Sequence, residues 1–142
     1  MQIRICKEED LESCSDTFAK VFNGAPWNEA WTAESACPYL LDFYRTPGFT
    51  GIVAVEAEEV IGFIFGAKRK WWSGEEFFIN EMCVRSDQQN KGIGKALMDY
   101  LLKTTDTKTI TLLTDRGLPA ETFYKRNGFE EIDRIMFLSR EV

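Results

Sequence analysis

A glycine-containing loop between a predicted strand and a predicted helix most constrains how this chain can fold. The strand-like stretch covers residues 77–84, and apolar residues recur at helical spacing from Ile93 to Leu101. Glycines let an anion approach the backbone closely, and the free N–H groups of a helix start favour negative charge. The junction therefore predicts a phosphate-binding cradle in an α/β fold. The loop reads Gln89-Asn90-Lys91-Gly92-Ile93-Gly94.

Two common phosphate-binding motifs fit this loop poorly. A P-loop needs a glycine where Gln89 stands and a hydroxyl where Ala96 stands. A dinucleotide-binding loop needs a third glycine, but Leu97 holds that place. Asp115 falls about twenty residues further on, where a ribose-binding acid is expected, yet a partial motif of this kind often arises by chance. We give the dinucleotide alternative little weight.

A third pattern, Q/R-x-x-G-x-G/A after a strand, fits the loop fully. Residues 79–102 resemble the acetyl-CoA-binding motif of the GNAT family of N-acetyltransferases, with Gln89, Gly92 and Gly94 at its defining positions. Residues 120–129 resemble the second signature of that family, A-x-x-F-Y-x-x-x-G-F. The two signatures occur in the family's order. The resemblance covers nearly the whole chain, although residues before about 50 match in layout only.

Composition narrows the class of protein. A chain of 142 residues with 44% hydrophobic residues predicts one domain spanning residues 1–142. The formal net charge of −6 argues against nucleic-acid binding, and no apolar run is long enough to span a membrane. Residues 1–7 lack the apolar core of a signal peptide, so we expect a cytoplasmic protein. The four cysteines are widely and irregularly spaced, which suits neither a zinc site nor a disulfide scaffold, so no metal site is predicted.

Hydrophobic periodicity predicts the order β-α-α-β-β-β-α-β-α-β. A helix between two parallel strands implies a mixed α/β sheet of the α+β type. The GNAT resemblance adds that the sheet is mostly antiparallel, with splayed central parallel strands flanked by helices. Strands are expected over residues 2–6, 51–57, 60–67, 77–84, 109–114 and 132–138, and helices over residues 8–22, 32–44 and 93–102 and after Pro119.

The resemblance assigns the residues that bind acetyl-CoA. Backbone N–H groups of the loop would hold the pyrophosphate, and the main chain of the preceding strand would bind the pantetheine arm. Many family members carry an asparagine where this chain has Gly117, so that contact is either missing here or supplied by Thr114. The expected cofactor-binding residues are Met82, Cys83, Val84, Gln89, Asn90, Lys91, Gly92, Ile93, Gly94, Lys95 and Thr114.

Two residues are expected to carry the chemistry. By resemblance Tyr124 protonates the departing CoA thiolate, and a phenol is a plausible acid because it stays protonated at neutral pH. Since the chain lacks histidine, a carboxylate or an ordered water must take the proton of the amine. Glu81 resembles the acid that some family members use for this step, either directly or through a water. The structural alternatives are a packed tyrosine and an acid at a strand end. Period two places Glu81 on one face with Ile79 and Cys83.

The acceptor is predicted only as a class. The negative net charge of the chain favours a small cationic amine, such as an aminoglycoside-like compound or a polyamine, over a protein N-terminus or lysine. Trp27 and Glu29 lie where the family builds its acceptor wall and could hold a cation. A noncatalytic acyl-CoA-binding module is the alternative from another class. The family resemblance also allows a homodimer, in which the C-terminal strands meet a second copy.

Overall fold

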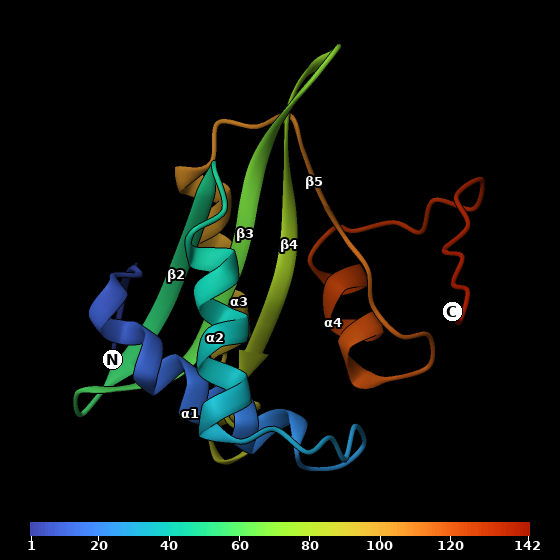
Figure 1. Ribbon diagram of the computed structural model, residues 1–142. Helices are drawn as coiled ribbons and strands as arrows, with labels where there is room; N and C mark the ends of the chain where they lie inside the picture. The colour runs from blue at the N-terminus through green and yellow to red at the C-terminus, as the bar shows by residue number, and fades with distance from the viewer.

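A five-stranded sheet in the order β1-β2-β3-β4-β5 organises the chain, all 142 residues of which are described by a computed structural model (Figure 1). Neighbouring strands are antiparallel except β4 and β5, which are parallel. The strands are β1 (Gln2–Ile5), β2 (Phe49–Glu56), β3 (Glu59–Trp71), β4 (Gly74–Val84) and β5 (Thr109–Leu112), and the helices are α1 (Leu11–Phe22), α2 (Ala33–Tyr44), α3 (Ile93–Thr104) and α4 (Pro119–Arg126), with short 3₁₀ turns η1 (Glu8–Asp10) and η2 (Ser86–Gln88).

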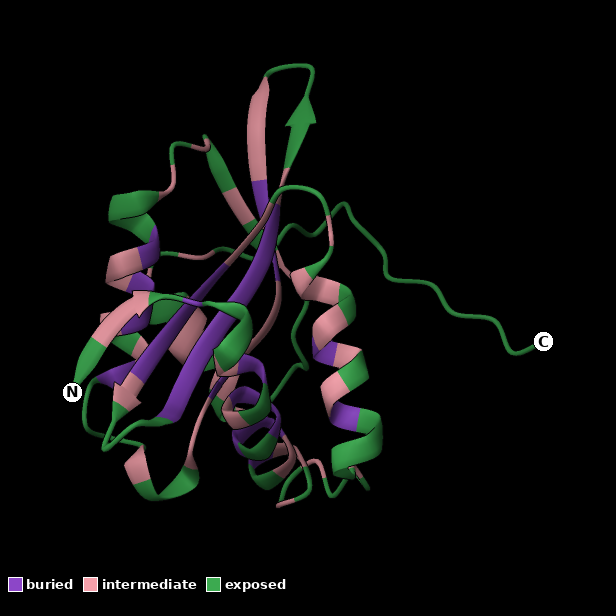
Figure 2. Ribbon diagram, turned by 60° about the vertical axis from the view of Figure 1, so that its left-hand side comes forward, coloured by how far each residue is buried: buried purple, intermediate pink, exposed green.

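Helices cover both faces of the sheet and divide its core in two. On one face Phe63 and Phe65 of β3 pack against α1 and α2. On the other face Ile64 of the same strand packs against α3, where Leu97 is fully buried. Successive side chains of β3 point to opposite faces of the sheet and so contribute to both cores. Figure 2 shows the buried stretches running along the central strands. This confirms the predicted fold class of a mixed sheet flanked by helices.

Local signals in the sequence set the helix ends. The Thr32 hydroxyl accepts a hydrogen bond from the Ser35 N–H at 3.2 Å, which caps α2. Pro119 begins α4, where its missing N–H costs nothing. Gly128 follows α4 with a φ of 90°, a conformation that ends helices readily. None of the four helices combines the length and apolar character that a membrane span requires.

A β-bulge in β4 changes which residues share a face. Phe65 pairs with Glu81 but the next residue, Gly66, pairs with Ile79, so Asn80 has no partner on β3. Ile79 consequently packs in the α3 core, whereas Cys83 packs in the α1 core. The expectation that Ile79, Glu81 and Cys83 share one face is therefore wrong, because a bulge shifts the alternation by one residue.

The pairing of β4 with β5 ends early. Their register runs from Glu76 opposite Thr109 to Ile79 opposite Leu112. The second half of β4, from Glu81 to Val84, pairs with β3 alone. Two parallel strands that part in this way leave a backbone edge open beside the start of α3, and Figure 1 shows β4 and the chain after β5 diverging there.

The predicted last strand is absent. No residue from 130 to 142 belongs to a helix or strand, and every one of them is exposed. A strand over residues 132–138 needs a neighbour to accept its backbone hydrogen bonds, and the chain places none beside it. The apolar pattern that suggested a strand is present, but its partner is not.

Candidate active site

The glycine loop joins η2 to α3 through two left-handed residues. Gly92, the residue before α3, has a φ of 79°, and Asn90 has a φ of 63°. Glycine adopts this conformation without strain, and asparagine tolerates it better than most residues. An added Cβ on Gly92 would meet nothing within 4 Å, whereas one on Gly94 would come to 3.0 Å from the Phe123 ring. Gly92 thus serves the turn, and Gly94 serves the packing of α3 against α4.

Six consecutive N–H groups of this loop have no acceptor within the protein. From Asn90 to Lys95 no backbone N–H donates to another backbone group or to a side chain, and the first bond of α3 is from Ala96 to the Gly92 carbonyl at 3.0 Å. Unpaired amides at a helix start, together with the helix dipole, form an anion-binding surface. The site therefore suits a diphosphate.

The polar side chains of the loop differ in whether a hydrogen bond or an ion pair within the protein already holds them. The Gln89 side chain donates to the Val84 carbonyl at 3.0 Å and ties the loop to the end of β4. Lys91 lies 3.4 Å from the Gln88 side-chain oxygen and has no carboxylate partner. Lys95 forms an ion pair with Asp99 at 2.7 Å. Of the two lysines, Lys91 has the freer charge to meet a phosphate.

The open half of β4 presents backbone groups to the gap. The Arg85 N–H donates to the Ile61 carbonyl on β3 at 2.8 Å. Because backbone groups alternate in direction along a strand, Cys83 also directs its N–H and C=O toward β3, whereas Met82 and Val84 direct theirs away from it. Met82 and Val84 are therefore the residues whose main chain faces the splayed side. Thr114 lies exposed in the loop after β5.

Glu81 is half-buried and bound by one side chain. The Tyr39 hydroxyl, from α2, donates to its carboxylate at 2.8 Å. Burial, against the opposing Tyr39 hydrogen bond and with a smaller contribution from the charge of Glu29, raises the pKa of Glu81 to about 6. A carboxylate with this pKa is mostly ionised at pH 7 and accepts protons better than an ordinary glutamate.

Tyr124 lies on α4 and packs edge-on against Phe123 and Phe129, with ring centroids 5.3 and 5.6 Å away. Its hydroxyl has no hydrogen-bond partner within the protein. Burial raises its pKa, and the charge of Glu81 raises it further. The phenol therefore keeps its proton at neutral pH and lies within electrostatic range of Glu81. Burial also raises the pKa of Cys83, which keeps this thiol protonated and unreactive.

The segment between α1 and α2 brings a different tryptophan to Glu29 than the sequence suggested. The Trp31 indole N–H donates to the Glu29 carboxylate at 2.6 Å, while Trp27 packs against Phe22 with ring centroids 4.9 Å apart. Trp31 also packs against the Tyr39 ring at 4.9 Å. These contacts place a Glu29–Trp31–Tyr39–Glu81 cluster on the α2 side of β4.

Sequence reasoning missed Trp31 and Tyr39 as site residues. The available signal was weak: a buried tyrosine needs a partner for its hydroxyl, and an acid without a basic neighbour needs a donor. Tyr39 and Glu81 lie 42 positions apart, so only the packing of α2 on the sheet joins them.

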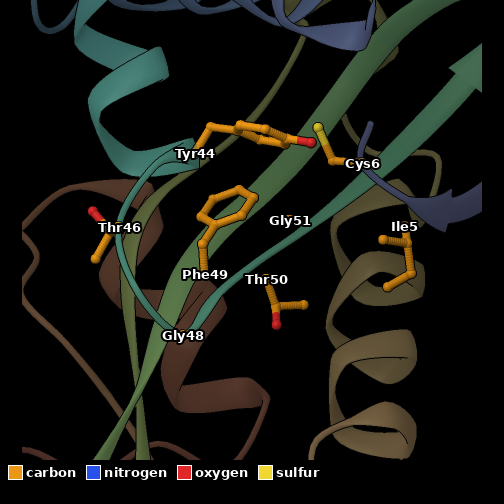
Figure 3. A pocket seen from close by; sticks show the side chains of 8 residues that line it. All are labelled: Ile5, Cys6, Tyr44, Thr46, Gly48, Phe49, Thr50 and Gly51. Atoms are coloured by element: carbon orange, nitrogen blue, oxygen red, sulfur yellow. The ribbon is translucent and has the colours of Figure 1, made fainter. Parts of the chain in front are cut away.

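Two surface hollows differ in where they lie relative to Glu81. The larger, about 460 Å³, lies at the opposite, β1 edge of the sheet and contains none of the predicted site residues (Figure 3). The smaller, about 340 Å³, includes Asn80 beside Glu81 and Phe43, whose ring packs on Tyr39 at 4.9 Å. Arg69 lines it as well and gives it one positive group. The smaller hollow is therefore the one adjoining the Glu81 cluster.

Comparison with known proteins agrees with this geometry. The sequence model of the acetyltransferase (GNAT) domain matches residues 47–131, which include the sheet from β2 to β5, the glycine loop and α4. No protein with a curated description matches the chain.

Solved structures share the fold at low sequence identity. A transcriptional regulator from Bacillus halodurans C-125 is 21% identical with a TM-score of 0.78, over 99% of both chains. An aminoglycoside acetyltransferase from an uncultured soil metagenomic sample is 18% identical with a TM-score of 0.75, over 99% of this chain and 97% of that one. AAC(6')-Iy, solved with the bisubstrate analogue CoA-S-monomethyl-acetylneamine, is 16% identical with a TM-score of 0.76, over 99% and 98%.

Proposed function

This chain belongs to the GNAT family of acetyltransferases, and we propose that it moves an acetyl group from acetyl-CoA to a small cationic amine. The observation that carries the proposal is the row of six unpaired N–H groups from Asn90 to Lys95 at the start of α3. They open beside the half of β4 that β5 leaves without a partner, and on the same side of the molecule as Tyr124 of α4. A nucleotide diphosphate and the arm attached to it fit these two adjoining surfaces.

The protein would hold acetyl-CoA mainly through its backbone. The amides of residues 90–95 would bind the pyrophosphate, with Lys91 adding a charge, and Gln89 would fix the loop against β4. Met82 and Val84 would pair with the amides of the pantetheine arm, in the manner of a strand added to an open edge. Thr114 and the main chain of Cys83 remain the weaker candidates, because one is exposed and the other faces β3.

In the proposed reaction the amine attacks the thioester carbonyl directly. Glu81, or a water that it orients, takes a proton from the ammonium and so frees the nitrogen lone pair. A C–N bond forms and the C–S bond breaks. Tyr124 gives its proton to the departing thiolate, which leaves as the thiol. The attacking nitrogen loses its second proton as the intermediate collapses, and this proton restores the Tyr124 phenol. A preorganised N–H on the open edge of β4 stabilises the charge on the carbonyl oxygen.

The surroundings of Glu81 support a cationic acceptor. Glu29 lies close enough to Glu81 that its charge raises the pKa of the Glu81 carboxyl. The aromatic rings of Trp31 and Tyr39 pack against each other, with their centroids 4.9 Å apart. Carboxylates and aromatic faces together bind ammonium groups well. AAC(6')-Iy and the soil aminoglycoside acetyltransferase share the fold, which makes aminoglycosides a second acceptor group to test beside polyamines.

The decisive experiment measures CoA-thiol release with acetyl-CoA and a panel of amines, alongside calorimetry of CoA binding. The matched pair in the panel is putrescine and γ-aminobutyrate, which differ in replacing one ammonium with a carboxylate. We expect CoA to bind and putrescine to be acetylated faster. Preference for γ-aminobutyrate would contradict the cationic class and point to Arg69 of the smaller hollow instead.

The remaining outcomes separate the alternatives. Turnover only with peptides would indicate a protein N-terminal or lysine acetyltransferase. Tight CoA binding with no turnover on any amine would indicate a noncatalytic acyl-CoA-binding module. No heat with CoA would remove the proposed function altogether.

A further inference from the structure

The smaller hollow beside Glu81 holds polar groups that the proposed reaction does not use. Arg69 of β3 lines it, and its guanidinium makes no ion pair or hydrogen bond within the protein. Asn80 of β4 lines it too, and its side-chain amide makes no hydrogen bond. Free donors that converge on one space can bind the oxygen atoms of a ligand that enters it.

The hollow and Glu81 lie on the same face of the sheet. Phe43 of α2 lines the hollow, and its ring packs on Tyr39, whose hydroxyl binds Glu81. The residues that line the hollow from the sheet are two apart on each strand and therefore share a face. They are Ala67 and Arg69 on β3, and Phe78 and Asn80 on β4. A molecule bound at Glu81 can thus extend into the hollow.

The strand register gives the length of this path. Phe65 pairs with Glu81, and Arg69 is four residues further along β3, which separates the two positions by about 13 Å. An amine bound at Glu81 needs a chain of about eight carbon atoms, roughly 11 Å, to bring its other end beside Arg69. Putrescine has half as many carbon atoms and stays at the Glu81 end.

The two ends of the path differ in charge. Glu29 and Glu81 make one end negative, whereas Arg69 makes the other positive and repels a second ammonium. A carboxylate is disfavoured there as well, because Glu76 lies opposite Arg69 and is held in place by the Thr109 hydroxyl at 3.2 Å. An uncharged group with an oxygen atom meets neither repulsion.

We propose that Arg69 determines acceptor specificity by rejecting a second ammonium, so that the hollow takes the hydroxyl end of an amino alcohol. The Arg69 guanidinium and the Asn80 amide donate to the hydroxyl oxygen, and the Phe43 and Phe78 rings pack on the carbon chain. This inference rests on the proposed acetyl transfer. It narrows the acceptor to amines whose positive charge lies at one end.

The test compares kcat/KM per amino group for an eight-carbon amino alcohol and the eight-carbon diamine, with acetyl-CoA at saturation and putrescine as the reference. The wild type should prefer the amino alcohol by about fourfold, the effect of two like charges about 5 Å apart in water. Arg69→Gln should abolish this preference, and Arg69→Lys, which keeps the charge, should retain it. Lys70→Gln is the matched control. It removes the same charge from the next residue of β3, whose side chain points to the opposite face, and should leave the preference unchanged.

The outcomes separate this inference from the proposed function. If putrescine is acetylated but the wild type uses both eight-carbon amines equally, or its preference survives in Arg69→Gln, only the role of Arg69 is overturned. Turnover of putrescine and of neither longer amine would overturn that role too, because the hollow then takes no part in binding. A faster rate with the eight-carbon amino carboxylate than with the amino alcohol would contradict the uncharged end group. No turnover of any amine would overturn both proposals.

Discussion

At the scale of single residues, Glu81 owes its properties to the fold around it. The bulge at Asn80 turns it toward α2, where Tyr39 binds its carboxylate at 2.8 Å. Burial and the charge of Glu29 raise its pKa to about 6 against the opposing effect of Tyr39. Both its reactivity and its effect on stability should therefore change in one pH window.

Glu81→Gln tests that window. In the wild type kcat/KM should rise with pH through about 6, and the variant should lose this limb and about 100-fold in rate. The contribution of Glu81 to the stability of the fold, in contrast, decreases as the pH rises. A carboxyl with a raised folded pKa favours folding below its unfolded pKa of about 4.3, and this contribution is lost as pH rises through about 6. The difference in melting temperature, variant minus wild type, should hence grow from pH 4 to pH 8. An unchanged pH profile would remove Glu81 as the base.

Tyr39→Phe separates positioning from catalysis. The phenol hydrogen bond lowers the pKa of Glu81, so its loss should move the acid limb of kcat/KM upward by about half to one pH unit. The rate above that limb should fall much less than in Glu81→Gln. Tyr44→Phe, a tyrosine of the same helix that packs on Phe49 away from Glu81, is the matched control and should leave the limb in place. A purely structural role for Tyr39 would lower stability without shifting the profile.

Tyr124→Phe asks whether the free hydroxyl on α4 is the acid. The ring contacts with Phe123 and Phe129 remain in the variant, so folding should be preserved. Turnover should fall by about 100-fold, while the Kd for CoA measured by calorimetry stays within about twofold. Tyr100→Phe on α3 provides a control outside the predicted acid position. Equal turnover in wild type and Tyr124→Phe would show that the hydroxyl only packs.

At the scale of elements, local patterns predicted the helices and most strands. The Thr32 cap, Pro119 at the start of α4 and the glycine loop each act within a few residues of themselves. The β4 bulge and the Tyr39 contact depend on the pairing partner and on helix packing, which no local pattern encodes. The strand predicted over residues 132–138 failed for the same reason, because a strand is defined by its neighbour.

Gly92→Ala tests the loop as an element, with Gly128→Ala as its matched control. Both glycines have φ values in the left-handed region, 79° and 90°, and an added Cβ would meet nothing within 4 Å of either. Each substitution should therefore cost about 1–2 kcal/mol of stability through backbone strain alone. Only Gly92→Ala should also weaken CoA binding, by about tenfold, because it disturbs the unpaired amides of residues 90–95. Equal CoA affinity in the two variants would show that the cradle does not bind the diphosphate.

At the scale of the whole molecule, the negative net charge and the carboxylates of Glu29 and Glu81 both attract a cation. The chain carries a formal charge of −6, and Glu29 and Glu81 add a local negative field beside the smaller hollow. Such a field draws cations toward the site at low ionic strength and is screened within about 8–10 Å at physiological salt. The acceptor should thus be guided to the site from a distance before it makes any contact.

Salt dependence measures that guidance. With acetyl-CoA held at saturation, kcat/KM for putrescine should fall severalfold as ionic strength rises from about 0.01 M to about 0.15 M, because the Debye length falls from about 30 Å to about 8 Å. γ-Aminobutyrate, which carries no net charge, should respond much less. Glu29→Gln should flatten the putrescine dependence while leaving the Trp31 indole an acceptor oxygen for its hydrogen bond. A putrescine rate that is indifferent to salt, or that rises with it, would contradict a cationic acceptor, since screening can only weaken attraction between opposite charges.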